Sequence, residues 1–256
     1  MRKGTYIRSK CVVWFLMSVL IPSLICMYWV IALRDNPQLA TLFSTSKIIS
    51  YYITIVVLNA LLTSHMKEHT MRVDIQNGGM SRYLLKPQSY YWYNIIFEEI
   101  PYRIIQGIYG FIIMAVIALA FPGFLTIGHE SGLFILGVLS GIMGFFICAN
   151  IEIMLGLLAF WFYDLKLVHN AYEVIYIMLG GINIPLYLFP HFLEQIAYFT
   201  PLPYIIYIPT LFLTGQVEGP AVIGLIARQF LWLLVTSIVY RIIWTKGIRV
   251  YTASGS

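Results

Sequence analysis

The sequence predicts an all-α membrane protein with six transmembrane helices. Hydrophobic residues make up 60% of the chain and charged residues only 11%, whereas soluble domains carry about 25% charged residues. Uncharged runs recur along the chain, and several reach the roughly 20 apolar residues that a helix needs to cross a bilayer. We therefore expect a single transmembrane domain over residues 1–256.

The first two predicted spans cover residues 11–33 and 48–64. A basic N-terminal segment precedes the first span. No small-residue cleavage motif follows the apolar run of that span, which argues against a cleaved signal peptide. Pro22 should kink this span, as a membrane helix tolerates when neighbouring helices cover the freed carbonyl. Between the second and third spans, residues 65–103 form the only sizeable polar segment.

Four further spans follow the polar segment. They cover residues 104–121, which Pro122 and Gly123 end, then 133–160, 168–188 and 221–243. The uncharged stretch 196–217 is also long enough to span, but three prolines interrupt it. We expect broken helices within an outer region, 185–219, that dips into the interface or re-enters the membrane.

Two readings of this outer region stay open. One is a proline-ended helix followed by a surface loop, and the other is a re-entrant hairpin that forms an outer gate. The residues that would shape such a gate are Gly180, Gly181, Pro185, Pro190, Pro201 and Pro203.

The distribution of cations orients the predicted spans. Thirteen Lys and Arg residues lie on the side of both termini, and only Arg34 and Lys47 lie on the other. Because cytoplasmic loops carry the excess of Lys and Arg, both termini and the segment 65–103 should be cytoplasmic. The region 185–219 is then extracytoplasmic.

Residues 74–87 are the most distinctive part of the polar segment. Gly78 and Gly79 break the backbone, because glycine tolerates positive φ and gives little helical support. A compact group of leucines and cations follows, and Pro87 ends it. Composition alone fits both a short helix that docks on a partner and a loop that only connects two spans.

No catalytic motif occurs in the chain. There is no Gly-x4-Gly-Lys-Ser/Thr loop, no His-Glu-x-x-His and no Gly-x-Ser-x-Gly. Cys11, Cys26 and Cys148 lie in or beside apolar spans and fit small buried hydrophobes. We therefore expect no catalytic residue and no metal. We also expect no nucleic-acid partner, because a net charge of +5 in a membrane protein mostly reports orientation.

Glu152 is the most informative polar residue within a span. It lies about ten residues, or roughly 15 Å of helix, from Tyr163 at the inner interface, and therefore near mid-bilayer. Its helical face also holds small residues: Gly137, Gly141, Gly144 and Cys148. The Gly-x3-Gly spacing lets helices approach closely, so Glu152 should face protein or a cavity. It could be a protonated packing residue or a member of the transport path.

Two other polar residues lie within predicted spans. Arg228, about six residues into the sixth span, could pair with Glu152 or extend to the outer headgroups. Asn150 lies on the opposite helical face from Glu152, so we expect it to bond a different helix. Both are candidates for the transport path.

Four stretches carry a family resemblance. They are Asp74-Ile75-x-x-Gly78-x-x-Ser81-Arg82-Tyr83-Leu84-Leu85-Lys86-Pro87, Gly156-Leu157-Leu158-Ala159-Phe160-Trp161, the Gly180-Gly181, Ile184-Pro185, Phe189-Pro190 and Thr200-Pro201-Leu202-Pro203 series, and Trp244-x-x-Gly247-Ile248-x-x-Tyr251. In order and spacing they resemble the permease subunits of type-2 ATP-binding-cassette (ABC) exporters, in a six-span branch of uncharacterised or multidrug-type permeases. The likeness covers essentially the whole chain.

The resemblance implies a cytoplasmic coupling helix seated in a groove of a separate ABC ATPase subunit. The implied coupling residues are Ile75, Gly78, Gly79, Ser81, Arg82, Tyr83, Leu84, Leu85, Lys86 and Pro87, with Asp164 and Lys166 in a second, smaller contact. Two permease chains, identical or homologous, would enclose the path in the cell membrane of a bacterial-type cell. Two ATPase subunits would bind ATP and Mg, and this chain would hold no cofactor.

We therefore expect a subunit of an ATP-driven exporter for a hydrophobic or amphipathic substrate, such as a drug, a lipid-like molecule or a peptide toxin. Two alternatives come from other classes. One is a proton-coupled secondary transporter that uses Glu152, and the other is a membrane scaffold or immunity protein that transports nothing. Neither alternative accounts for residues 74–87.

Overall fold

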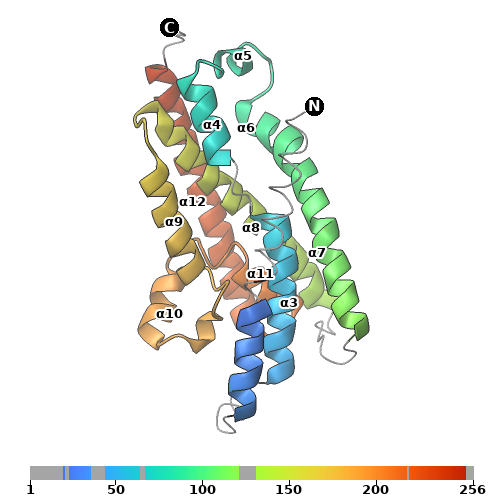
Figure 1. Cartoon of the computed structure of the whole chain (residues 1–256). Coiled ribbons are helices and arrows are strands. Elements are labelled where there is room, and N and C mark those ends of the chain that lie inside the picture. The colour runs from blue at the N-terminus through green and yellow to red at the C-terminus, as the bar shows by residue number, and fades with distance from the viewer. Residues whose placement is uncertain are drawn as a thin grey trace.

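The computed structural model describes residues 20, 23–35, 44–63, 67–120, 131–217 and 219–251. Every regular element in these residues is helical, which confirms the all-α class (Figure 1). Three described helices are long and apolar enough to cross a membrane: Thr45–Leu62, Gly132–Phe160 and Ala221–Val250. They coincide with the second, fourth and sixth predicted spans. The basic N-terminal segment, part of the first span, Pro122 and Gly123 lie outside the described residues.

The bundle is built around α8 (Ser131–Leu157), which continues into a 3-10 turn at Leu158–Phe160. The longest helix, α12 (Ala221–Val250), packs along α8, and α3 (Thr45–Leu62) and α11 (Tyr207–Leu213) pack on α8 as well (Figure 1). The 30 residues of α12 correspond to about 45 Å of helix, which exceeds the roughly 30 Å hydrocarbon core.

Glycines set the spacing between α3 and α7 (Ile100–Ala120). A Cβ atom at Gly110 would lie 3.3 Å from the Cα atom of Val57, and one at Gly107 would lie 2.3 Å from Leu61 Cδ2. Small residues of this kind let membrane helices approach closely. The sequence predicted this span from residue 104, whereas the helix already begins at Ile100.

The start of α7 differs from the expectation because the helix does not begin afresh there. A helical turn at Tyr90–Tyr93 (α6) continues through a π-helical segment, Asn94–Glu99, directly into α7. Pro101 lies at the second residue of α7. Proline lacks an N–H and its ring conflicts with the carbonyl one turn earlier, and a widened turn accommodates both problems.

Two short helices lie at one end of the molecule, beside the C-terminal end of α12 (Figure 1). They are α4 (Lys67–Gln76) and α5 (Ser81–Leu84). We call residues 67–89 the arm, and we call this end of the molecule the arm end.

The fifth predicted span ends earlier than expected. Its helix, α9, covers Lys166–Leu179, which is about 21 Å and too short to cross the hydrocarbon core alone. Gly180 ends the helix, and Gly181 follows with φ of +74°, a conformation that glycine adopts without strain. The chain therefore turns away at residue 180, whereas the predicted span continued to residue 188.

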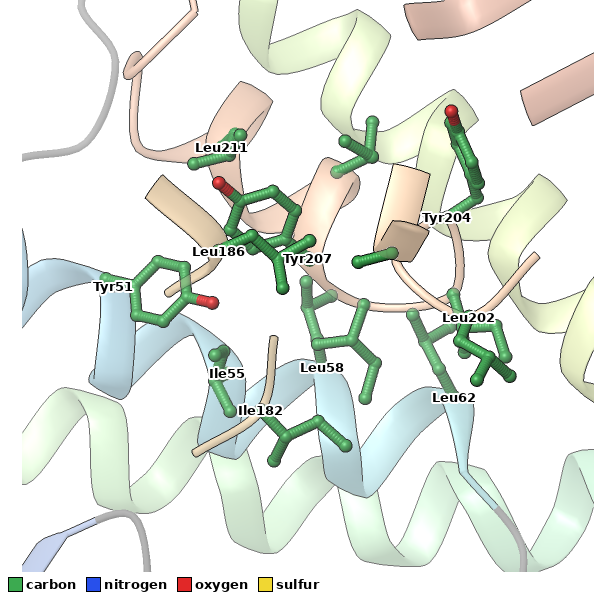
Figure 2. Packing of buried hydrophobic residues seen from close by; sticks show 14 of the residues in the cluster. Tyr51, Ile55, Leu58, Leu62, Ile182, Leu186, Leu202, Tyr204, Tyr207 and Leu211 are labelled. Carbon is green, nitrogen blue, oxygen red and sulfur yellow. The ribbon is translucent and has the colours of Figure 1, made fainter. Parts of the chain in front are cut away.

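Short elements follow α9, as the interrupting prolines predict. They are a 3-10 turn at Leu186–Leu188, then α10 (His191–Tyr198), a non-helical stretch and α11. We call residues 180–217 the outer segment. Its central part is not a surface loop, because Tyr204, Ile205 and Ile206 are fully buried. Figure 2 shows side chains of α3, such as Ile55 and Leu58, packed against this segment.

Candidate functional site

The arm is anchored by its apolar side chains. Met71 and Ile75 of α4, together with Met80, are buried in a cluster with Ile153 and Leu157 of α8. The same cluster holds Tyr90 of α6, so α4, α6 and α8 share one small core at the arm end. Ile75, one of the predicted coupling residues, therefore fixes the arm to the bundle.

The two glycines of the arm have different tasks. Gly78 has φ of +72°, which allows the chain to reverse after α4. A Cβ atom at Gly79 would lie only 2.9 Å from the Asp74 carboxylate. That carboxylate accepts a hydrogen bond from Arg82 Nη2 at 2.9 Å, which closes the turn with an ion pair. The glycine pair thus makes the turn that the sequence predicts and leaves room for this ion pair.

Aromatic rings support the helix after the turn. Tyr83 lies edge-on to Tyr90 and Tyr93, with ring centroids 5.1 and 5.0 Å apart. Lys86 places its ammonium group 4.9 Å from the Tyr93 ring, a cation–π contact. Ser81 Oγ lies 3.0 Å from the Tyr251 hydroxyl, beyond the end of α12. Burial raises the pKa of the Tyr83 hydroxyl above its ordinary value.

The tip of the arm points into solvent. Leu85 is 88% exposed and Leu84 is 42% exposed. Arg82, Lys86 and Pro87 are exposed around them. An apolar residue as exposed as Leu85, flanked by cations and held on an anchored turn, has the character of a contact surface.

The loop between α8 and α9 lies beside the arm. Gln76 Nε2 of α4 donates a hydrogen bond to the Tyr163 carbonyl at 2.6 Å. Asp164 accepts a hydrogen bond from the Lys166 backbone N–H at 2.9 Å, which orders the start of α9. Tyr163 and Leu167 are 84% and 82% exposed. The structure thus brings the two predicted contact regions to one end of the molecule.

Glu152 lies inside the bundle, as its helical face predicts. It is 6% exposed, and the Cys148 thiol lies 3.6 Å from its Oε1 atom. Arg103 of α7 and Tyr176 of α9 lie within electrostatic range of this carboxyl group. Glu152 is therefore part of a buried polar group between α7, α8 and α9.

The glycine face of α8 meets the outer segment rather than a long helix. A Cβ atom at Gly137 would lie 2.7 Å from Leu213 Cδ2, and one at Gly144 would lie 2.3 Å from the Ile205 carbonyl oxygen. A Cβ atom at Gly141 would meet nothing within 4 Å. The close approach therefore uses Gly137 and Gly144, a different pair from the predicted Gly137-x3-Gly141.

Asn150 and Arg228 occupy different surroundings. Asn150 Nδ2 donates to Thr236 Oγ1 and Ser237 Oγ of α12, at 3.2 and 3.0 Å, so it bonds a different helix as predicted. Arg228 is exposed near Tyr204, and its neighbour Gln229 bonds Ser140, about 18 Å along α8 from Glu152. The structure therefore does not bring Arg228 to Glu152.

The prolines of the predicted outer gate begin short turns. Pro190 precedes α10 and accepts hydrogen bonds from the Leu193 and Glu194 N–H groups. Pro185 precedes the 3-10 turn, and the Pro201 and Pro203 carbonyls accept bonds from Tyr204 and Ile208. Gly180 and Gly181 lie against Tyr176 and Tyr207, where added Cβ atoms would clash.

Polar side chains that the sequence analysis missed satisfy the buried backbone of the outer segment. Gln229 Nε2 of α12 donates to the carbonyls of Tyr204 and Ser140, both at 2.8 Å. The Tyr51 hydroxyl donates to the Gly181 carbonyl, and Tyr52 donates to Asn183 at 2.6 Å. Non-helical backbone inside a membrane bundle requires such partners. The sequence signal for such a hydrogen-bonding role was Gln229, a glutamine in the middle of an apolar run.

A buried ion pair was also missed. Arg103 Nε donates to Glu99 Oε2 at 2.6 Å, and both side chains are about 5% exposed. From the sequence, both residues belong to the predicted cytoplasmic segment, because charges usually mark the end of a span. Within the described ranges, no three His, Cys, Asp or Glu side chains gather closely enough to hold a metal ion.

These features define a multi-pass helical membrane protein with an exposed, anchored arm at one end. The sequence profile described as "ABC-2 family transporter protein" matches residues 15–255, and the chain therefore belongs to this family. The family comprises membrane permeases of ABC transporters, which are transport subunits without an ATPase site of their own and which work with a separate ABC ATPase subunit. Comparison with curated proteins gave no match.

Proposed function

We propose that this chain is the membrane subunit of an ATP-driven exporter for an apolar or amphipathic substrate. The exposed tip of the arm supports this proposal more than any other observation. Leu85 presents an apolar side chain to solvent on a turn that a buried cluster holds in place. Such a rigid projection suits the transfer of force from a soluble partner.

The ATPase subunit would dock on two adjacent surfaces. The first is the tip, with Arg82, Leu84, Leu85, Lys86 and Pro87, and the second is the loop with Asp164 and Lys166. Gly78, Gly79, Ser81 and Tyr83 would support the tip rather than contact the partner. The hydrogen bond from Gln76 to the Tyr163 carbonyl keeps the two surfaces together.

The transport cycle would use movement supplied from outside the chain. Two ATPase subunits would bind ATP and Mg, and their closure would move the arms of two permease chains, identical or homologous. The arms would then shift the spans between inward-open and outward-open populations. The outer segment would close the path on the far side, as a re-entrant element of the six-span topology in the cell membrane.

Purification of the tagged chain tests this proposal. Wild-type protein, solubilised from membranes in mild detergent, should retain an ATP-hydrolysing subunit. Leu85→Asp should lose that subunit, because a carboxylate would replace the exposed apolar contact. Asn77→Asp is the matched control, because it adds the same charge at an exposed position on the same arm.

The outcome distinguishes the exporter from its rivals. Retention of the ATPase by wild type and Asn77→Asp, with loss in Leu85→Asp, supports the docking role. Recovery of a transporter that works on a proton gradient without an ATPase would refute the proposal and favour a secondary transporter.

A further inference from the structure

The arm continues at its C-terminal end into one long helix. This helix begins at Tyr90, directly after the arm, and continues without interruption to Ala120. Its first turn belongs to the arm end, because Tyr90 stacks on Trp244 of α12 with centroids 5.5 Å apart. Its later part, α7, packs against α3. Movement at the base of the arm can therefore pass along this helix to α7 and α3.

The π-helical segment Asn94–Glu99 lies between these two parts. A π segment holds an extra residue within an α-helix, and such segments often mark functional sites. If one π turn became α-helical, the helix before it would rotate by about 100° and shift by about 1.5 Å relative to α7. The segment can thus change the register of α6 without unfolding the helix.

Arg103 connects the π segment to the rest of the bundle. Its guanidinium group donates to Glu99 within the segment, and Nη1 donates to the Leu61 carbonyl at the end of α3, 3.2 Å away. The same group lies 4.9 Å from the centre of the Phe145 ring of α8. One side chain therefore contacts the π segment, α3 and α8.

Burial makes these contacts interdependent. When an ion pair is buried, removal of one partner leaves an uncompensated charge, which costs much more than loss of an exposed pair. Arg103 must then follow Glu99 when the π segment moves. The contacts with α3 and α8 would transmit that displacement to the spans.

We propose that Arg103, paired with Glu99 at the C-terminal end of the π-helical segment, is the positioning residue that passes movement of the arm to α3 and α8. This inference rests on the proposed function, because the movement comes from the ATPase. It adds a specific route from the docking surface to the spans.

Hydrogen–deuterium exchange of the full complex tests the route without knowledge of the substrate. The permease and its ATPase subunit are placed in lipid nanodiscs and compared with and without ATP and vanadate. In wild type, trapping should change exchange both in the arm, residues 80–89, and in the paired helices, residues 55–62 and 104–112. In Arg103→Gln the change in the arm should remain, and the change in the paired helices should be lost.

Further variants separate positioning from folding. Glu99→Gln should behave like Arg103→Gln, whereas Glu98→Gln should behave like wild type, because Glu98 is the exposed neighbour. The exchanged pair Glu99→Arg with Arg103→Glu should restore part of the response. This rescue keeps the test valid if the single variants are unstable.

The result that overturns the inference is specific. It is a wild-type response in the paired helices of Arg103→Gln or Glu99→Gln while the ATPase remains bound. Loss of the response in Glu98→Gln as well would also overturn it. Absence of an ATPase subunit from the wild-type complex would instead refute the proposed function.

Discussion

At the level of single residues, the packing of the outer segment on α8 depends on positions that lack a side chain. Gly144 brings α8 against the Ile205 carbonyl, and Gly137 does the same at Leu213. Gln229 then donates a hydrogen bond to the buried Tyr204 carbonyl of the segment. Close approach of the two segments and hydrogen bonds to the buried backbone are both required, because helix association in a membrane gains little from apolar burial.

A matched pair of glycines tests this packing. Gly144→Ala should destabilise the protein by about 1–3 kcal/mol, because overpacking against rigid backbone has a cost of this size. Gly141→Ala should change stability by less than about 0.5 kcal/mol, because its Cβ atom would meet nothing within 4 Å. Thermal unfolding in detergent measures both. Equal melting temperatures for the two variants would contradict this view of the interface.

At the level of elements, the arm consists of a buried base and an exposed tip. Met80 is fully buried, whereas Leu84 and Leu85 face solvent a few residues later. The base belongs to the same cluster as α8, so the tip has a fixed direction. A loop that only connected two spans would not need this anchorage.

Truncation of a buried side chain in the base should release the arm from its contact with α8. Met80→Ala removes a buried side chain, which costs about 2–5 kcal/mol. Trypsin should then cleave after Arg82 at least about tenfold faster, a rate factor that corresponds to 1.4 kcal/mol. Leu84→Ala is the control, because it truncates a half-exposed leucine of the same arm and should leave the cleavage rate unchanged. Equal rates in the two variants would show that the cluster does not hold the arm.

The main helices could be predicted from the sequence, but not all of their end residues. Hydropathy identified 48–64, 133–160 and 221–243 because each is a long apolar run. It extended the fifth span beyond Leu179, since residues 180–188 are as apolar as the helix before them. The Gly180-Gly181 break was visible, but only the contact of Gly181 with Tyr207 shows that the chain must turn there.

The candidate site was predictable where it depended on local patterns. The glycine turn and the leucine–cation tip could be read directly from residues 74–87. The Glu99–Arg103 pair could not, because a charge near the end of an apolar run normally marks an interface. Its burial depends on α3 and α8, whose positions the sequence does not reveal.

At the level of the whole molecule, the arm end and α10 lie at opposite ends of the bundle (Figure 1). The excess of cations predicts that the arm end is cytoplasmic. Single cysteines test this topology. A membrane-impermeant maleimide should label Gln195→Cys in intact cells and Lys86→Cys only after permeabilisation, because both positions are exposed but face opposite sides.

The wild-type chain with its own cysteines gives the background labelling for that experiment. Labelling of Lys86→Cys in intact cells would place the arm outside the cell. An arm in that position could not reach a cytoplasmic ATPase.

Photo-cross-linking from position 85 in intact cells tests most directly whether a separate ATPase drives this permease through the arm. With a benzoylphenylalanine probe in place of Leu85, we predict capture of a protein that carries the Gly-x4-Gly-Lys-Ser/Thr loop, identified by mass spectrometry. The same probe at Gln195, at the opposite end, should capture no such protein. If the probe at position 85 captured no ATP-binding subunit in a chain that remains folded in the membrane, the arm would not be the site of coupling.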